Sequence, residues 1–194
     1  MKVLTLILIT PALFMVFACG SNSSNADSTD NDSTTVARDM DSDLNTEQVQ
    51  APQNGLSDEE FAKEAANGGL AEVALGKLAI EKATDAKVKE FAQMMVTDHT
   101  KANDELKALA SAKSITLPTA PKADKQMTKD ELSSLTGAAF DKAYAEQMVV
   151  DHEKTVALFE AGKTSVQDPE LVTFIDKTLP VIKEHLEHSK KLSK

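Results

Sequence analysis

Apolar side chains recur at helical spacing through most of the chain after residue 56. In Phe91–Leu106 they form one helical stripe, and an acidic residue and a histidine, Asp98-His99, are set into it. The same arrangement returns 53 residues later in Tyr144–Phe159, which contains Asp151-His152. A helix buries such a stripe against its neighbours. We therefore expect two of the four histidines of the chain in matching, core-facing surroundings.

Capping signals divide this pattern into helices. Ser57 with Glu60 has the spacing of a capping box, and Thr128 with Glu131 repeats it. Two aspartates, one of them followed by proline, are typical N-caps. We therefore expect helices over residues 57–83, 85–112, from 137 to about 161 with Gly162 as the stop, and from 168 onward, plus a short helical turn starting at 128.

An internal repeat groups the helices into two hairpins. Residues 85–92 align with residues 168–175 at an offset of 83, and Phe61-Ala62 meets Tyr144-Ala145 at the same offset. The stretch from 113 to 127 contains two prolines and would join the hairpins as a long connection. Two hairpins with one long crossover make the ferritin-like version of the four-helix bundle. The sequence thus predicts an all-α, ferritin-like four-helix bundle over residues 55–194.

Counting residues from the hairpin turns places four polar side chains at the same level. Glu72 and His99 lie 13 residues before and 14 after the first turn, and His152 and His185 lie 16 before and 17 after the second. One carboxylate and three imidazoles that meet inside a bundle could bind a divalent transition metal such as Zn²⁺, Cu²⁺ or Fe²⁺. Asp98 and Asp151 would then orient these ligands or add to them.

A hydrogen-bonded network that only specifies packing is the alternative for the same residues. Ring nitrogens within roughly 3–4 Å of one another would favour a shared ion, whereas well-separated rings bonded to carboxylates would favour the network. No histidine lies in the Glu-x-x-His motif of di-iron bundles. The 83-residue repeat also pairs His99 with Ile182 and His152 with Gly69, which argues against a symmetric two-metal oxidase.

Composition changes abruptly before the bundle. Residues 1–18 have a lysine followed by a short apolar core, which is typical of a secretory signal. The only cysteine, Cys19, follows at once in a context that resembles a bacterial lipobox, so we expect its lipidation and a durable membrane anchor. Residues 19–54 are rich in Ser, Asn, Asp and Thr and are expected to form a disordered acidic tether. A net charge of −10 argues against nucleic acid as a partner.

Three segments carry a resemblance to a known family. They read MMVTDHTKAN at 94–103, GAAFDKAYAEQMVVDHEKTVALFE at 137–160 and LPVIKEHLEHSKKL at 179–192. Together with the export signal and the spacer, they make residues 56–192 resemble the exported bacterial "domain of unknown function 4142" family. The resemblance implies a ferritin-like helical fold and recurring histidines that match His99, His152 and His185. The family has no established reaction, so the resemblance implies no catalytic residue.

Two functions follow from these observations. The first is a membrane-anchored envelope lipoprotein, facing the periplasm or at the outer membrane, whose bundle is a non-enzymatic binding or structural module with a buried Asp/His centre. The alternative is a metal-binding protein that uses Glu72, His99, His152 and His185. Oxidase activity or metal storage would be the function of such a site. The sequence defines no protein or small-molecule partner.

Overall fold

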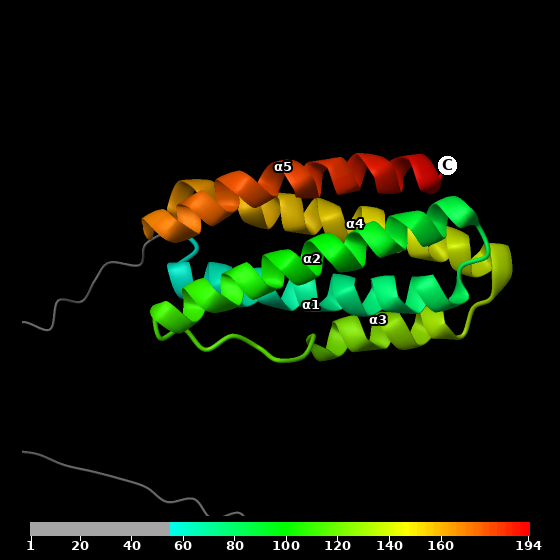
Figure 1. Cartoon of the computed structure of the whole chain (residues 1–194), viewed down its shortest axis with the longest axis horizontal. Helices are drawn as coiled ribbons and strands as arrows, with labels where there is room; N and C mark the ends of the chain where they lie inside the picture. The colour runs from blue at the N-terminus through cyan, green and yellow to red at the C-terminus, as the bar shows by residue number, and fades with distance from the viewer. Residues whose placement is uncertain (1–54) are drawn as a thin grey trace, which may run out of the picture. The chain divides into compact units, whose positions relative to one another are not determined.

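The computed structural model describes residues 55–194, which form five α-helices and no strand (Figure 1). No helix among these residues is both long enough and apolar enough to cross a membrane. The expected signal segment, Cys19 and the acidic tether lie outside the described residues. The helices are α1 (Asp58–Lys82), α2 (Ala86–Ala112), α3 (Ala123–Ser133), α4 (Gly137–Ser165) and α5 (Pro169–Leu192).

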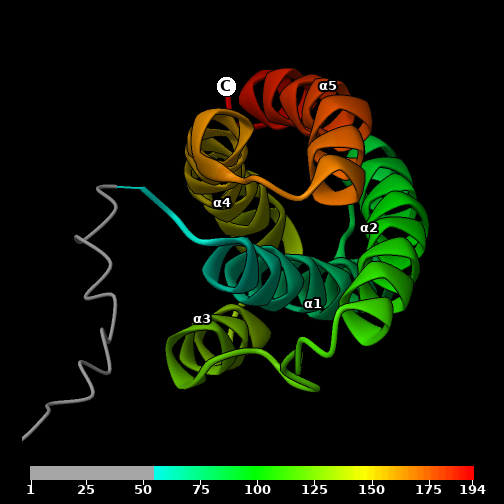
Figure 2. The same ribbon diagram turned by 90° about the vertical axis from the view of Figure 1, so that its left-hand side faces the viewer.

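Four of the helices form a bundle of two antiparallel hairpins. Viewed end-on, α1 lies beside α2 and α4, and α5 lies beside α2 and α4 (Figure 2). The connection from α2 runs back along the outside of the bundle and carries α3, which packs on α1 and α4. The expected all-α, ferritin-like bundle with one long crossover is confirmed.

Side-chain caps start three of the bundle helices where the sequence predicts them. Ser57 and Glu60 form both bonds of the capping box at the start of α1. Asp85 accepts from the backbone amide of Lys87 and begins α2. Asp168 accepts from the backbone amides of Glu170 and Leu171 and begins α5, whose first helical residue is proline.

The prediction for α3 was wrong. The helix begins at Ala123, five residues before the expected start, and the Thr128 hydroxyl donates to the carbonyl of Asp124 inside it. Lys122 is the N-cap without any capping side-chain bond of its own. Its backbone amide donates instead to Asn67 Oδ1 of α1 at 2.7 Å, so a distant helix fixes where α3 starts.

The predicted end of α4 was also wrong. The helix continues past Gly162 to Ser165, and Gly162 is buried within it. A Cβ at this position would lie 2.8 Å from the ring of Phe61, so the glycine serves the close approach of α1 to α4. The beginning of α4 at Gly137, with φ of +60°, is a conformation that suits glycine.

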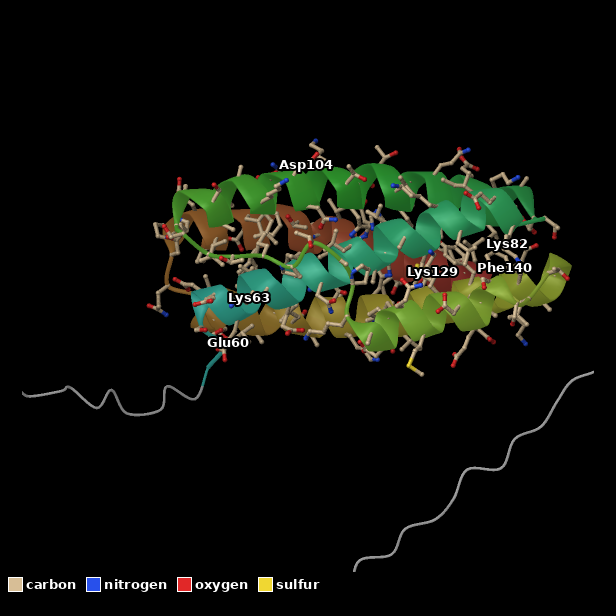
Figure 3. The ribbon with its side chains drawn as sticks, turned by 90° about the horizontal axis from the view of Figure 1, so that it is seen from below. Glu60, Lys63, Lys82, Asp104, Lys129 and Phe140 are labelled. Atoms are coloured by element: carbon tan, nitrogen blue, oxygen red, sulfur yellow. The ribbon has the colours of Figure 1, made fainter. Side chains whose placement is uncertain are left out.

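Two apolar clusters fill the bundle. One gathers around Phe61, Phe159 and Phe174, and the other around Phe91 and Tyr144. Along α1, α2 and α4 a buried polar level separates these clusters. At the second cluster's end, Lys82 binds the last turn of α3 and lies over the Phe140 ring (Figure 3).

Candidate metal centre

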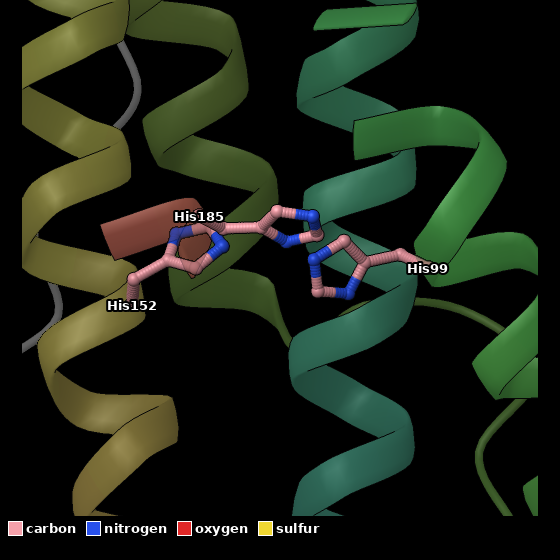
Figure 4. A group of neighbouring side chains, drawn as sticks. All are labelled: His99, His152 and His185. Carbon is pink, nitrogen blue, oxygen red and sulfur yellow. The ribbon is translucent and has the colours of Figure 1, made fainter. Parts of the chain in front are cut away.

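Each bundle helix contributes one side chain to the polar level between the apolar clusters. Glu72 comes from α1, His99 from α2, His152 from α4 and His185 from α5. The three imidazoles point toward one another from their separate helices (Figure 4). Their ring centroids are 5.2 to 5.7 Å apart, and one nitrogen from each ring lies within 4.8 Å of the other two. The structure thus brings all four sequence-predicted residues to one level.

One nitrogen of each ring lies within 3.0 Å of an oxygen atom of the bundle. His99 Nδ1 lies 3.0 Å from Glu72 Oε2, and His185 Nε2 lies 3.0 Å from Asp98 Oδ2. His152 Nδ1 lies 2.8 Å from the carbonyl oxygen of Met148, one turn earlier in α4. The Met148 carbonyl and an ionised Asp98 carboxylate only accept, so His152 Nδ1 and His185 Nε2 donate their protons outward.

The other nitrogen of each ring is buried and has no hydrogen-bond partner. These atoms are His99 Nε2, His152 Nε2 and His185 Nδ1. Buried polar atoms are nearly always paired, so three such atoms in one place require an explanation. When the opposite nitrogen donates, each free nitrogen carries a lone pair, which is the form that binds a metal ion.

Burial disfavours the charged form of His99 and of His185. Burial, followed by the proximity of His152, lowers the pKa of His99 to about 3. Burial, followed by the proximity of His99, lowers the pKa of His185 to about 4. Burial likewise raises the pKa of the Glu72 carboxyl. His99 and His185 therefore present neutral imidazole nitrogens at physiological pH.

Glu72 lies at the edge of the three-histidine group. Its Oε1 is 3.8 Å from the free Nε2 of His152 and 3.4 Å from the Thr155 hydroxyl. Its other oxygen, Oε2, lies 3.0 Å from His99 Nδ1. Glu72 therefore supports one imidazole and lies near enough to a second to complete a coordination shell after a small movement.

The two aspartates occupy different places. Asp98 binds His185, as described above, and its side chain is 39% exposed. Asp151 is buried but makes no hydrogen bond to any of the histidines; its Oδ1 forms an ion pair with Lys125 of α3. The structure therefore separates Asp151 from the imidazoles.

Sequence reasoning missed three polar groups around this centre. Lys125 belongs to a helix whose start was misplaced, so nothing suggested that it would reach Asp151. Tyr144 is fully buried, and its hydroxyl has no hydrogen-bond partner. Burial raises the pKa of this hydroxyl, and the nearby charge of Glu72 raises it as well. Thr155 donates to Glu72 Oε1 at 3.4 Å, and nothing in the sequence analysis singled it out. The heptad-like spacing of Tyr144, Asp151 and Thr155 on one face of α4 was the available signal.

The geometry lies between the two expectations for the ring nitrogens. Their separation of up to 4.8 Å exceeds the expected 3–4 Å, and the outer nitrogens of two rings lie 3.0 Å from carboxylate oxygens. The inner nitrogens, however, remain without partners. A network that only specified packing would satisfy them.

The chain matches the family described as "Domain of unknown function (DUF4142)" over residues 43–192. The chain belongs to this family. The match begins 13 residues before the expected position 56, inside the segment predicted to be a tether. None of the curated proteins matches the sequence.

Solved structures with the same fold have low sequence identity to this chain. CopM in its Cu(II)-bound form has a TM-score of 0.62 at 18% identity, covering 72% of this chain and 97% of that chain. CopM in its Ag-bound form has a TM-score of 0.59 at 19% identity, with coverages of 70% and 93%. A DUF305 fragment from Deinococcus radiodurans has a TM-score of 0.62 at 12% identity, with the same coverages. At these identities the likeness shows a shared helical-bundle fold.

Proposed function

We propose that this DUF4142 bundle binds one transition-metal ion through His99, His152 and His185. The three unpartnered, buried imidazole nitrogens support the proposal most directly. Metal-binding histidines usually donate their other ring N–H to a carboxylate or carbonyl, which fixes the ring and raises its basicity. His152 and His185 have such a partner, and His99 Nδ1 lies 3.0 Å from Glu72 Oε2.

The donor set favours Cu²⁺ or Zn²⁺. Neutral imidazole suits both ions, and at nitrogen sites Cu²⁺ binds more tightly than Fe²⁺. Residues 55–194 contain no cysteine that could supply a thiolate. CopM, which has a similar fold, has been solved in Cu(II)- and Ag-bound forms. Copper is therefore the first ion to test, and zinc the second.

Binding requires a modest contraction of the centre. A tetrahedral ion with bonds of about 2.0–2.1 Å to nitrogen holds its ligands about 3.3 Å apart. The ring nitrogens, at up to 4.8 Å, would move inward, and Glu72 Oε1 or an external ligand would take the fourth position. Because the imidazoles are shielded from solvent, we propose binding or storage of the ion rather than turnover of a substrate.

Titration of the purified, chelator-treated protein with Cu²⁺ and Zn²⁺ tests this function. We expect one ion per chain and a raised melting temperature, because a ligand that binds only the folded state stabilises it. His152→Ala should weaken the affinity by more than the roughly 10–100-fold that loss of an outer partner costs. Isothermal titration with a competing chelator measures the affinity.

His188→Ala is the matched control. His188 lies on α5 with His185 but packs against Phe91 at a centroid distance of 5.0 Å, outside the three-histidine group. Its loss should leave stoichiometry and affinity unchanged. Unaltered melting of the wild type with either ion, or equal losses in the two variants, would contradict the proposed function.

We further propose that the bundle works outside the cytoplasm, held at a membrane by lipidated Cys19. Support comes from the sequence, where an apolar signal-like segment precedes the cysteine and an acidic stretch separates it from the bundle. Cys19→Ala should release the exported protein from the membrane fraction into the soluble fraction. Immunoblots of the two fractions measure this, and a variant that stays with the membrane would refute the anchor.

A further inference from the structure

The centre approaches solvent at one carboxylate. The side chains of Glu72 and the three histidines are between 0 and 7% exposed, whereas that of Asp98 is 39% exposed. The same carboxylate lies 3.0 Å from His185 Nε2. The His185 ring therefore separates an exposed carboxylate on its outer side from the buried nitrogens on its inner side.

A small pocket opens at this carboxylate. It has a volume of about 110 Å³ and lies between α2 and α5, which are neighbours in the end-on view (Figure 2). Asp98 lines it from α2 and Val181 lines it from α5. An ion pair between Glu105 and Lys177 joins the two helices at its wall, with a distance of 2.5 Å.

The opposite side of the bundle is unfavourable to a cation. There Lys125 of α3 extends toward the core and pairs with the buried Asp151. The lysine side chain is only 16% exposed, so its positive charge is poorly screened. Lys101 and Lys177 also line the pocket at Asp98, but Lys177 is paired with Glu105, and no lysine of residues 55–194 lies within ion-pair distance of Asp98. The exposed negative charge of Asp98 is thus free to attract a cation.

We propose that metal ions reach the buried centre through the seam between α2 and α5, where Asp98 takes up the cation and passes it to His185. This path rests on the proposed metal binding. Asp98 replaces part of the hydration shell of the arriving ion, and its hydrogen bond to His185 opens to let the ion pass. The bond then forms again and holds the ring with Nδ1 toward the centre.

The substitution Asp98→Asn tests the role of the Asp98 charge separately from that of its hydrogen bond to His185. The amide oxygen still accepts from His185 Nε2, but the variant lacks the charge that attracts the ion. Stopped-flow mixing of the full-length, metal-free protein with Co²⁺ follows loading by visible absorbance. We expect association to slow roughly tenfold, the lower end of electrostatic steering, and to lose much of its dependence on salt.

Val181→Trp tests the pocket by obstruction. A bulky side chain at this wall should slow association and chelator-measured dissociation by the same factor, because both directions use one path. The equilibrium affinity for Co²⁺ should then stay unchanged. Val150→Trp is the matched control, since Val150 is similarly exposed, 44% against 37%, but lies in the groove between α3 and α4.

The outcomes distinguish the path from the metal site itself. If Asp98→Asn and Val181→Trp load at the wild-type rate, the α2–α5 path is refuted while metal binding stands. If Val150→Trp slows loading as much as Val181→Trp, the path is refuted as well. If the wild-type protein binds no Co²⁺, Cu²⁺ or Zn²⁺ at equilibrium, the proposed function fails and the path fails with it.

Discussion

The three clustered histidines show how the outer nitrogen of an imidazole determines what the inner nitrogen can do. His152 is fixed by a backbone carbonyl of its own helix, so its orientation depends only on local geometry. His185 is fixed by the Asp98 carboxylate of α2, and His99 Nδ1 lies 3.0 Å from a Glu72 oxygen of α1, so the surroundings of both rings depend on the packing of helices. Each arrangement leaves the inner nitrogen available for a ligand.

Burial of His185 makes the stability of the metal-free protein depend on pH. Its pKa is about 4 in the folded state, below the usual value of 6.5. Between these values the unfolded chain binds a proton that the folded protein does not. The free energy of unfolding therefore rises with pH in this window, and the contribution of this group is lost as pH falls from about 6.5 to 4.

We expect His185→Gln to remove up to about 1.4 kcal/mol per pH unit from this slope. Urea unfolding of both metal-free proteins at several pH values between 4.5 and 7.5 measures the difference. The raised pKa of Glu72 acts with the opposite sign, but Glu72 is present in both proteins and its contribution largely cancels. Parallel stability curves would show that His185 is not kept neutral by burial.

At the scale of the helices, small residues set how closely α1 approaches its neighbours. A Cβ at Gly76 would lie 2.8 Å from Val96 Cγ2 and 3.2 Å from the Ala92 carbonyl oxygen, both on α2. A Cβ at Gly68, two turns earlier, would lie 3.8 Å from the Thr155 hydroxyl, an ordinary contact. The contact at Gly76 thus helps set the spacing of the first hairpin, which carries Glu72 and His99.

Two substitutions in α1 should therefore have opposite signs. Gly76→Ala is expected to destabilise the protein, because overpacking of about 1–3 kcal/mol exceeds the helix-propensity gain of about 1 kcal/mol. Gly68→Ala makes the same chemical change without the clash and should stabilise by up to about 1 kcal/mol. Urea unfolding of the two variants measures both values. Equal stabilisation by both would mean that Gly76 does not limit the approach of α2.

The sequence was sufficient for the helices whose start signals are local. Ser57 and Asp85 cap their helices through residues two or three positions away, so the signal is present in a short window. The start of α3 could not be predicted because Asn67, 55 residues earlier, accepts from its N-cap amide. The capping-box spacing at Thr128 was misleading, because its hydroxyl bonds within the helix.

The same distinction applies to the candidate site. The level of the four residues followed from counting along antiparallel hairpins, which depends only on helical rise. The outer partners followed only in part: Asp98 was expected to orient a ligand and lies 3.0 Å from His185 Nε2, whereas rotamers and the lateral packing of helices decide the contacts of the other two rings. Asp151 illustrates this, since it was expected beside the histidines and instead pairs with Lys125 from the crossover.

At the scale of the molecule, a near-symmetric bundle carries an asymmetric centre. The 83-residue repeat relates the two hairpins, and it pairs Glu72 with Thr155, which are in contact at 3.4 Å. The histidines break the repeat, because His185 corresponds to Ala102 and His152 to Gly69. The repeat thus supplies the scaffold, while substitutions on one side of each pair supply a single polar centre between two apolar clusters.

X-ray absorption spectroscopy of the copper- or zinc-loaded protein tests the central claim most directly, because it identifies the atoms bound to the ion. Our account predicts three nitrogen neighbours at about 2.0–2.1 Å, with the outer-shell scattering of three imidazole rings. His188→Ala should give the same spectrum, and His152→Ala should lose one ring. A shell of oxygen atoms without imidazole scattering would contradict the account, because the ion would then lie on the acidic surface and not at the centre.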